Sequence, residues 1–333
     1  MKKIGINGFG RIGRLALRVI LQKFSDRIEV PIINTSGSMD TKGWAHIFEF
    51  DTMYRRFPGS VEVDGDYMIV NGKRIFVSAE REPENIPWGD YGVETVLEST
   101  GVFEDERGMS KHLRGSVKQV ILSAPGKGEG IQTVVKGVND EEAKGKTLVS
   151  NASCTTNCIS PVSKVMLENF TVKKAAMTTI HAFTSDQSLQ DGSHKKDLRR
   201  ARSASQNVIP TSTGAAIAMT KVLPQLKGKF DGIAIRVPVA TASLSDLTYL
   251  VDRPTTVEEV NEMFIEASKR DELKYFLYVT QKPLVSSDII GCEASAVVDL
   301  SLTQVIDGDL VKVYAWYDNE WGYANRLVEQ VLD

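Results

Sequence analysis

The stretch from Gly8 to Gly13, which reads GFGRIG, constrains the fold of this 333-residue chain more than any other feature. It follows a strand-like apolar run at residues 2–7 and precedes a helical stripe of apolar residues at positions 12, 15, 16, 19 and 20. A second strand-like run at residues 28–33 completes a βαβ unit. That is the context in which a G-x-G-x-x-G match indicates dinucleotide binding.

Each glycine of this stretch has a predicted task. Gly8 allows the tight turn, Gly10 lets the backbone approach a pyrophosphate, and Gly13 lets the helix pack on the strand. The pyrophosphate would then lie at the N-terminus of the helix. The alternative is a glycine-rich turn in another α/β fold.

The residues after the second strand bear on which dinucleotide binds. A carboxylate is expected there, bonded to the 2′-OH of the adenosine ribose, but the chain has Asn34, Thr35 and Ser36, and Asp40 comes later. A carboxylate repels a 2′-phosphate, whereas hydroxyl and amide groups can donate hydrogen bonds to it. The sequence therefore favours NADP, or use of both NADP and NAD. The alternative is that Asp40 reaches back to the ribose.

Several further runs predict the sheet that would carry this site. Alternation between residues 60 and 77 predicts antiparallel hairpins attached to a parallel sheet. Pro31 has no backbone N–H to donate to a neighbouring strand, so its place in the second strand is explained only if the strand has a bulge there. Strands at 95–98 and 119–122 end in small residues, and in an open α/β sheet ligands bind at such strand ends. The small residues are Ser99, Thr100 and Gly101 after one strand and Ser123 after the other. Ordinary turn chemistry is the alternative.

The stretch from Ser150 to Cys158 is the second organising feature. It lies between an apolar strand-like run at 147–149 and a helix-like run at 159–170, so Cys154 is expected where a helix begins. The unpaired N–H groups there favour negative charge, which lowers a thiol pKa and makes a nucleophile. The alternative is a buried cysteine beside a Ser/Thr N-cap. Cys158 follows one turn later, but no His/Cys cluster completes a metal site, so no metal is expected.

The second half of the chain predicts a different sheet. A strand at 172–183 carries His181, and long alternating runs follow at 232–237, 241–251, 294–299 and 310–317. With an amphipathic helix at 257–269, this pattern predicts a largely antiparallel sheet with helices on one face. A final helix is expected at 324–332.

Composition narrows the partners and the compartment. The basic run from His194 to Arg202 suggests a polyanion, but the net charge is −3 and no aromatic residues interleave it, which disfavours nucleic acid and favours a solvated or subunit-facing loop. Three cysteines make no disulfide framework, which indicates a reducing compartment. No signal-peptide core or membrane-length apolar run is present. We expect a cytoplasmic protein without a membrane partner.

Taken together, the motifs resemble those of the phosphorylating glyceraldehyde-3-phosphate dehydrogenases over essentially the whole chain. The motifs that carry the resemblance are Ile6 to Arg14, Ser150 to Cys158, His181 to Thr184, Asp197 to Arg202, Pro210 to Ala215, Arg236 to Pro238 and Trp316 to Tyr323. The resemblance implies an α/β chain with a Rossmann-like dinucleotide-binding domain at 1–153. It also implies an α+β catalytic domain at 154–318 and a C-terminal helix, 319–333, that returns to the first domain. A homotetramer is implied as well.

The same resemblance assigns the chemistry. Cys154 would attack the aldehyde of glyceraldehyde 3-phosphate with His181 as its base, and the His181 ring and the Cys154 N–H would hold the oxyanion. Hydride would pass to the nicotinamide, and inorganic phosphate would release 1,3-bisphosphoglycerate from the thioester.

The remaining site residues divide between two tasks. Cofactor binding is expected from Gly8, Phe9, Gly10, Arg11, Ile12, Asn34, Thr35, Ser36, Ser99, Thr100, Gly101, Ser123, Ser193, Asn319 and Tyr323. Substrate and phosphate binding is expected from Ser153, Thr155, Thr184, Asp186, Arg200, Thr213, Gly214 and Arg236. Arg forks and hydroxyls suit phosphate oxygens, although Thr213 and Gly214 also fit a plain helix N-cap.

Two departures from the NAD-using members concern the cofactor. Thr35 stands where many relatives have Asp, and Gly192-Ser193 stands where many have Leu-Pro, a pair contributed by a neighbouring subunit near the adenosine ribose. Both departures favour NADP, with NAD possible. Two other functions stay open at this point. One is an erythrose-4-phosphate dehydrogenase that uses water instead of phosphate, and the other is a non-catalytic dinucleotide- or RNA-binding relative.

Overall fold

The computed structural model describes residues 1–195 and 197–332, so Lys196 of the basic run lies outside the described residues. The chain divides into two compact units. The first comprises Met1–Val134, Asp140–Ala152 and Ala324–Asp333, and the second comprises Val135–Asn139 and Ser153–Tyr323. The boundary between Tyr323 and Ala324 lies within helix α7 (Trp321–Glu329).

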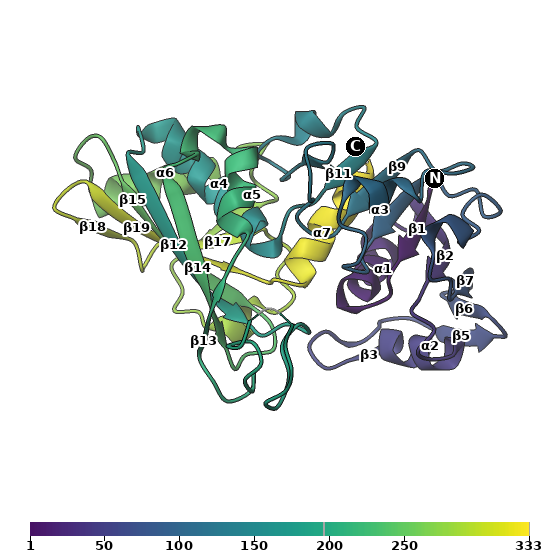
Figure 1. The fold of residues 1–333 in the computed structure, drawn as a ribbon. Coiled ribbons are helices and arrows are strands. Elements are labelled where there is room, and N and C mark those ends of the chain that lie inside the picture. The colour runs from purple at the N-terminus through teal and green to yellow at the C-terminus, as the bar shows by residue number, and fades with distance from the viewer. Residues whose placement is uncertain (196, 333) are drawn as a thin grey trace. The chain divides into compact units, whose positions relative to one another are not determined.

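The first unit is built on one sheet whose strand order is β10-β11-β9-β8-β1-β2-β7-β6-β5 (Figure 1). The bounds are β1 Lys2–Asn7, β2 Ile28–Asn34, β5 Val61–Asp64, β6 Tyr67–Val70, β7 Lys73–Ser78, β8 Thr95–Glu98, β9 Gln119–Leu122, β10 Gln132–Thr133 and β11 Leu148–Ser150. Strand β1 pairs in parallel with β2 on one side and β8 on the other. The strand order reverses between β1 and β8, and ligands bind at such reversals.

Two predicted details of this sheet are confirmed. Strands β5, β6 and β7 form the antiparallel hairpins, and β7 joins β2 in parallel. The pairing of β1 with β2 shifts register between Lys3↔Glu29 and Gly5↔Ile32. Three steps along β2 thus match two along β1, so a bulge lies beside Pro31, which has no N–H to donate.

The helices of the first unit are α1 (Arg11–Lys23), α2 (Thr41–Glu49) and the short α3 (Glu106–Ser110). Helix α1 was predicted from its apolar stripe, which is buried. The sequence analysis missed α2 and α3. Each begins at an aspartate, Asp40 or Asp105, whose side chain accepts a hydrogen bond from the backbone of the third residue on. A small two-stranded sheet, β3 (Phe50–Asp51) with β4 (Arg55–Arg56), follows α2.

The second unit is built on a mixed, mostly antiparallel sheet with strand order β13-β14-β12-β15-β19-β17-β16, and β18 pairs with β19. The bounds are β12 Lys174–Ala182, β13 Ile209–Ser212, β14 Phe230–Val237, β15 Ser243–Leu250, β16 Leu277–Thr280, β17 Ala296–Asp299, β18 Gln304–Ile306 and β19 Leu310–Tyr317. Strands β12 and β14 are parallel neighbours. This pairing decides the geometry of the site, because it places His181 of β12 level with Arg236 of β14.

Three helices accompany this sheet: α4 (Cys154–Asn169), α5 (Ala215–Val222) and α6 (Val257–Ala267). Helix α4 packs on β15, β17 and β19, α5 contacts α4 and β14, and α6 contacts α4 and β16. The start of α4 at Cys154 is as the sequence predicted. Strands β13, β16 and β18 were not predicted from the sequence.

Candidate active site

The glycine-rich turn and the end of β8 come together at the strand-order reversal in the first unit. Gly8 has φ of 95°, and a Cβ placed there would lie 2.6 Å from the backbone carbon of Ser99 and 2.7 Å from the Thr100 nitrogen. A Cβ on Gly13 would lie 2.0 Å from the Gly8 carbonyl oxygen, whereas one on Gly10 meets nothing within 4 Å. Gly8 and Gly13 are therefore required by packing. Gly10 is itself the N-cap of α1 and makes no side-chain cap there, so this open helix start suits a pyrophosphate.

Other predicted cofactor residues lie at the same edge, but with their side chains engaged. Phe9 is buried against Trp44 and Phe48. Arg11 pairs with Asp51. These two residues can offer a ligand their backbone more readily than their side chains. Asn34 is buried and donates to Asn7 Oδ1 at 2.8 Å.

The end of β2 holds the groups expected to face the adenosine ribose. Thr35 is buried, donates its hydroxyl to the Ser78 carbonyl at 3.0 Å and accepts from the Gly37 N–H at 3.3 Å. It lines a cavity of about 340 Å³ together with Asp40, Lys42 and Asp66. Asp40 also caps α2, since its Oδ1 accepts from the Gly43 N–H at 2.8 Å. The cavity therefore combines hydroxyls, one ammonium and two carboxylates.

A buried polar network below this edge was not anticipated from the sequence. His112 Nε2 lies 3.0 Å from Glu98 Oε2, and both residues are fully buried. Trp88 Nε1–H donates to His112 Nδ1 at 3.1 Å, so a neutral His112 carries its proton on Nε2 and donates it to Glu98. The other oxygen of Glu98 accepts the Thr100 N–H at 2.8 Å. The network thus fixes the turn after β8.

In the second unit, Cys154 is the first residue of α4. Ser153 is the N-cap, and its hydroxyl accepts from the Thr156 N–H at 3.0 Å. The preceding residue, Ala152, has φ of 52°, in the left-handed region that residues with a Cβ seldom adopt. This turn presents the thiol at the start of the helix, where backbone N–H groups have no intrahelical acceptor.

The thiol faces the imidazole that the sequence proposed as its base. Cys154 Sγ lies 3.4 Å from His181 Nε2. On the other side of the ring, His181 Nδ1 lies 2.6 Å from the Ala182 carbonyl oxygen and 2.7 Å from Arg236 Nη1. The parallel pairing of β12 and β14 produces this arrangement, because His181 and Arg236 are register partners.

Burial governs the titration of this pair. It raises the pKa of the Cys154 thiol, against the opposing effects of the Arg236 charge and of hydrogen bonds at Thr155. Burial, with the Arg236 charge, lowers the pKa of His181 to about 3. The sequence predicted a lowered thiol pKa from the helix N-terminus. In this structure burial acts against that expectation and raises the thiol pKa.

Tyr317 supports the site from β19 and was not singled out by sequence analysis. Its hydroxyl lies 2.9 Å from Thr155 Oγ1 and 2.7 Å from Thr179 Oγ1, and its ring packs edge-on against His181 at 6.0 Å. Thr155, predicted among the phosphate-binding residues, is buried with its hydroxyl on Tyr317. The Thr155 side chain therefore holds the start of α4 in place, and Thr155 could bind an anion through its backbone N–H.

The other phosphate candidates of the second unit form a connected polar group. Thr184 donates to Asp186, and Arg200 donates from Nη1 to Asp186 Oδ2 at 2.7 Å. Arg200 also donates to the Ser212 carbonyl at 3.0 Å, next to Thr213. Gly214 is the N-cap of α5, and Thr213 Oγ1 accepts from the Ala215 N–H at 3.1 Å. The N-cap alternative thus holds for this pair, and a capped helix start is compatible with anion binding.

Three further predicted residues belong to the second unit. Asn319 is buried and accepts from Ser243 Oγ at 3.1 Å, and the same hydroxyl accepts from the Ala182 N–H at 3.1 Å. Asn319 is thereby tied to the backbone beside His181. Tyr323 is buried in α7, and Ser193 is exposed in the loop after β12.

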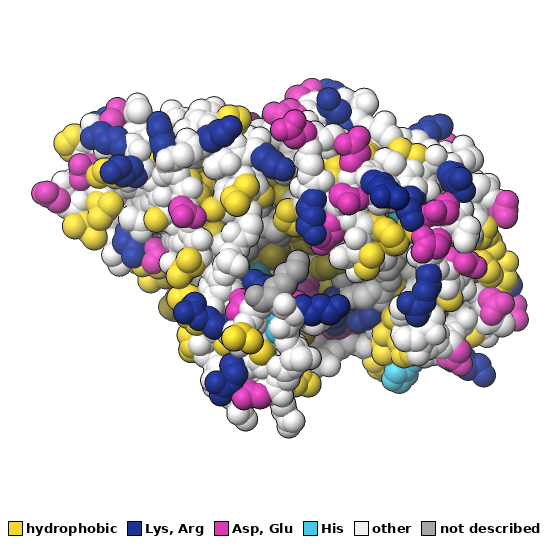
Figure 2. All heavy atoms as spheres, viewed as in Figure 1, with side chains coloured by type: hydrophobic (Ala, Val, Ile, Leu, Met, Phe, Trp, Pro, Cys, Tyr) yellow, Lys and Arg dark blue, Asp and Glu magenta, His cyan; other side chains and the backbone are white. Residues whose placement is uncertain are grey.

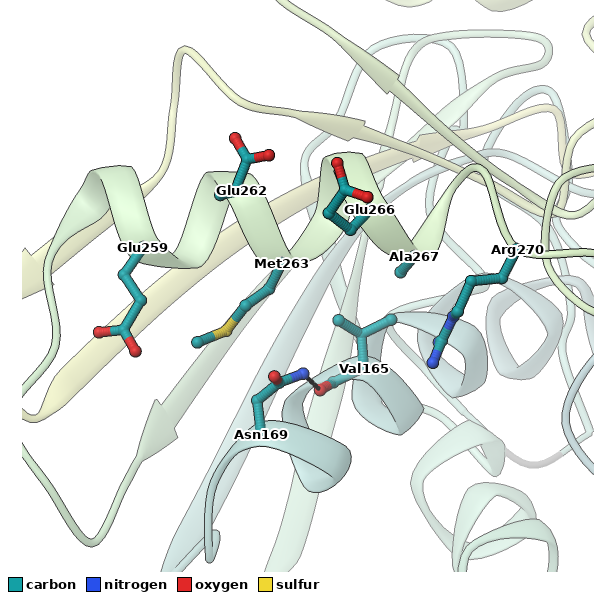
Figure 3. Close-up of a pocket in the computed structure, with 8 residues that line it drawn as sticks. All are labelled: Val165, Asn169, Glu259, Glu262, Met263, Glu266, Ala267 and Arg270. Atoms are coloured by element: carbon teal, nitrogen blue, oxygen red, sulfur yellow. Dashed lines mark hydrogen bonds between the residues drawn. The ribbon is translucent and has the colours of Figure 1, made fainter.

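A hollow elsewhere in the second unit lacks comparable chemistry. It measures about 470 Å³ and lies between α4 and α6, where Met263 points toward Val165 and Asn169 while Glu262 and Glu266 point away from them (Figure 3). One of its polar side chains already has a partner within the hollow, since Asn169 donates a hydrogen bond to the Val165 carbonyl at 2.8 Å. No cysteine or histidine lines it.

Three observations concern possible binding of polyanions, membranes and metal ions. On the face shown in Figure 2, Lys and Arg side chains are interspersed with Asp and Glu rather than gathered in one basic patch. Within residues 1–195 and 197–332, no helix is long and apolar enough to cross a membrane. In the same residues, no group of three or more His, Cys, Asp or Glu side chains is placed to hold a metal ion.

Comparison with known proteins identifies the relatives of the chain. Residues 2–106 match the family described as glyceraldehyde 3-phosphate dehydrogenase, NAD binding domain, and residues 153–319 match its C-terminal domain. The chain is 51% identical to glyceraldehyde-3-phosphate dehydrogenase 1 of Bacillus cereus over 99% of this chain and 97% of that protein. It is 50% identical to the Streptomyces coelicolor enzyme of that name, over 98% of this chain and 96% of that protein. It is 46% identical to glyceraldehyde-3-phosphate dehydrogenase 2 of Synechocystis, over 99% and 97%.

Proposed function

The chain belongs to the glyceraldehyde-3-phosphate dehydrogenase family, and we propose that it converts glyceraldehyde 3-phosphate and inorganic phosphate into 1,3-bisphosphoglycerate, reversibly, through a covalent intermediate on Cys154. The observation that carries this proposal is the thiol at the first residue of α4, 3.4 Å from His181 Nε2. A nucleophile and a base within reach of a hydrogen bond are what covalent acyl transfer requires.

The residues divide the chemistry as follows. The Cys154 sulfur attacks the aldehyde carbon after its proton passes to His181 Nε2, and the resulting oxyanion accepts from the protonated ring and the Cys154 N–H. A bound nicotinamide dinucleotide supplies the hydride acceptor. Loss of hydride from the thiohemiacetal leaves a thioester beside the protonated His181 ring, which donates to the new oxyanion when inorganic phosphate attacks the thioester. Cys154 is then released as the thiolate, to which the His181 ring later returns its proton.

Two phosphate positions are needed for this reaction. We assign the substrate phosphate to Thr184 and Arg236, with Asp186 positioning them, and inorganic phosphate to Ser153, Arg200, Thr213 and Gly214. The hydrogen bond from Arg200 to Asp186 at 2.7 Å supports neighbouring anion positions in the second unit. We assign Asn319 to the carboxamide of the nicotinamide, since it is buried and held by Ser243, and we place Tyr323 beside that ring.

The first unit fits a dinucleotide. The open space at Gly10 and the uncapped start of α1 suit a pyrophosphate. We propose that NADP is used in preference to NAD. Support comes from Thr35 at the end of β2 and from Lys42, a basic residue that lines the same cavity. Asp40 and Asp66 line that cavity too and favour NAD, so the preference rests on the hydroxyls and on Ser193 of a neighbouring subunit in a homotetramer.

The compartment and assembly follow from this assignment. Because Cys154 must be a free thiol and all three cysteines are free, we propose a cytoplasmic enzyme. If Ser193 reaches a neighbour's cofactor, dissociation of the tetramer weakens NADP binding.

Steady-state kinetics test the proposed function. Turnover of glyceraldehyde 3-phosphate should require inorganic phosphate, and kcat/KM should be higher with NADP than with NAD. A steady state independent of phosphate would favour the water-using erythrose-4-phosphate alternative. Absence of any turnover with a protein that binds NAD(P)H would favour the non-catalytic alternative.

A further inference from the structure

The last residues of three neighbouring strands in the first unit form a ladder of polar side chains. Asn34 ends β2, Asn7 ends β1 and Glu98 ends β8, and Asn7 is the register partner of both others. All three are buried, with at most 3% of their surface exposed. Neighbouring strands lie about 4.8 Å apart, so the side chains of level residues can bond directly. We call these three residues the polar ladder.

The hydrogen bonds of the polar ladder all run in the same direction. Asn34 Nδ2 donates to Asn7 Oδ1 at 2.8 Å, and Asn7 Nδ2 donates to Glu98 Oε2 at 2.5 Å. The backbone of Glu80 orients the first amide, because Asn34 Nδ2 donates to the Glu80 carbonyl at 2.8 Å and Asn34 Oδ1 accepts the Glu80 N–H at 2.9 Å. Successive bonds in one direction polarise and strengthen each other.

The polar ladder ends on a carboxylate that only accepts hydrogen bonds. Glu98 Oε1 accepts from the Thr100 N–H at 2.8 Å and from the Thr100 hydroxyl. Glu98 Oε2 accepts from Asn7 and from His112 Nε2, the latter at 3.0 Å. A carboxyl group with donors on both oxygens acts as the ionised form. Hydrogen bonds to a charged acceptor are roughly twice as strong as neutral ones, so Glu98 anchors the whole ladder.

A turn assigned to the dinucleotide follows each of the three strands. These turns begin at Gly8 after β1, at Thr35 after β2 and at Ser99 after β8. We propose that Asn7 is a positioning residue for the dinucleotide: as the middle member of the polar ladder, it holds the turns after β2 and β8 in a fixed relation. This inference rests on the dinucleotide site proposed for the first unit. Turns that are already in place lose less conformational freedom when a ligand binds, which favours binding.

Exchanging the two partners tests the bond between Asn7 and Glu98. Asn7→Asp sets two carboxylates against each other, and Glu98→Gln leaves a donor of the polar ladder without an acceptor. We expect each single variant to raise the Kd for NADH about tenfold, because the turns are then held less firmly. Fluorescence titration measures the Kd. The double variant again places a donor opposite an acceptor, with the direction of the bond reversed, and should bind NADH within about threefold of the wild type.

Two outcomes would overturn the inference. One is an additive loss in the double variant, about a hundredfold, since independent sites add. The other is a pair of folded single variants that bind NADH as tightly as the wild type. The proposed dinucleotide site is tested separately, because it fails only if the wild type itself does not bind NADH.

Trp88→Phe is the matched control for stability. It removes a buried hydrogen bond to His112 Nδ1 but leaves the bonds of the polar ladder in place. Its Kd for NADH should therefore stay within about twofold of the wild type, as expected for an independent site. A tenfold rise in this control would mean that any loss of stability weakens binding, and it would contradict the positioning role.

A measurement on the wild type does not depend on how the variants fold. The backbone amides of Glu80 and Thr100 donate to the two ends of the polar ladder, to Asn34 Oδ1 and to Glu98 Oε1. If the ladder opens as one cooperative unit, NADH should slow hydrogen exchange at both amides by the same factor, within about twofold. Slowing at one amide alone would overturn the inference.

Discussion

Cys154 Sγ and His181 Nε2 lie 3.4 Å apart, although 27 residues separate them in the chain. Two backbone features bring them together. The N-cap of α4 positions the thiol, and strand β12, which lies between β14 and β15, positions the imidazole. Because both devices belong to the second unit, the pair is formed within one compact body. The pair can therefore be tested one residue at a time.

Removing the nucleophile should abolish turnover. Cys154→Ala is expected to lower kcat by about 10⁴-fold or more, as for other covalent catalysts, and His181→Asn by about 10²–10⁴-fold. The measurements are kcat for glyceraldehyde 3-phosphate oxidation and the thioester burst. Cys158→Ala is the matched control, because that thiol is buried one turn later, with Sγ 3.8 Å from the Ala315 carbonyl oxygen and no contact with His181. Full activity in Cys154→Ala would contradict the mechanism.

The glycines of the first unit should separate stability from cofactor binding. Gly13→Ala places a Cβ 2.0 Å from the Gly8 carbonyl oxygen, which is backbone and cannot give way cheaply. It should lower the free energy of unfolding in urea by about 1–3 kcal/mol. Gly10→Ala meets nothing within 4 Å, so it should cost less than about 1 kcal/mol.

The same pair of variants gives the opposite ranking for the dinucleotide. Gly10→Ala should raise the Kd for NAD(P)H about tenfold, or 1.4 kcal/mol, if the pyrophosphate approaches this backbone. Fluorescence titration of NAD(P)H measures it. An unchanged Kd in a folded Gly10→Ala protein would show that the pyrophosphate binds elsewhere.

Much of the fold could be predicted from local pattern. Several elements show their own spacing of apolar residues and their own turn residues at the ends. They are β1, α1 and β2, the strands β8 and β9, and the long strands of the second unit. Pro31 could be predicted to need a bulge, because a missing N–H has few solutions in a strand. Cys154 could be placed at a helix start, because Ser153 and the apolar run after it fix that boundary.

What could not be predicted depends on contacts between distant segments. The contact of Arg236 with His181 can be predicted only if β14 is known to lie parallel to β12. The donor to His112, which is Trp88, can be identified only once the packing of the core is known. The direction of the Cys154 pKa depends on how far the sulfur is enclosed, which no spacing reveals. The role of Asp40 was open for the same reason, until its bond to Gly43 showed it to be a helix cap.

The buried network of the first unit makes a stability prediction. Trp88→Phe removes the N–H that donates to His112 Nδ1 at 3.1 Å and leaves a buried acceptor without a partner, which should cost about 1–3 kcal/mol. Trp44→Phe is the matched control, because Trp44 is buried in the same unit and its Nε1 has no hydrogen-bond partner among the described residues. Urea unfolding of both variants isolates the hydrogen bond. Equal losses would mean that only ring volume matters.

Cofactor preference should respond to a single charge at the end of β2. Thr35→Asp places a carboxylate beside the expected 2′-phosphate, and two charges about 4 Å apart near a protein surface interact by roughly 1–4 kcal/mol. The ratio of kcat/KM for NADP to that for NAD should therefore fall by about tenfold or more.

Thr35→Asn separates charge from the loss of the threonine hydroxyl. Both variants remove the hydrogen bond to the Ser78 carbonyl at 3.0 Å, and they have nearly the same shape, so their difference is the carboxylate charge. We expect Asn to keep the NADP ratio within about threefold of wild type, because it retains an uncharged donor. Lys42→Met should lower kcat/KM for NADP and leave kcat/KM for NAD unchanged, since Lys42 lines the same cavity. If Asp and Asn change the ratio equally, Thr35 does not face a 2′-phosphate, and the preference must be set by another part of the chain.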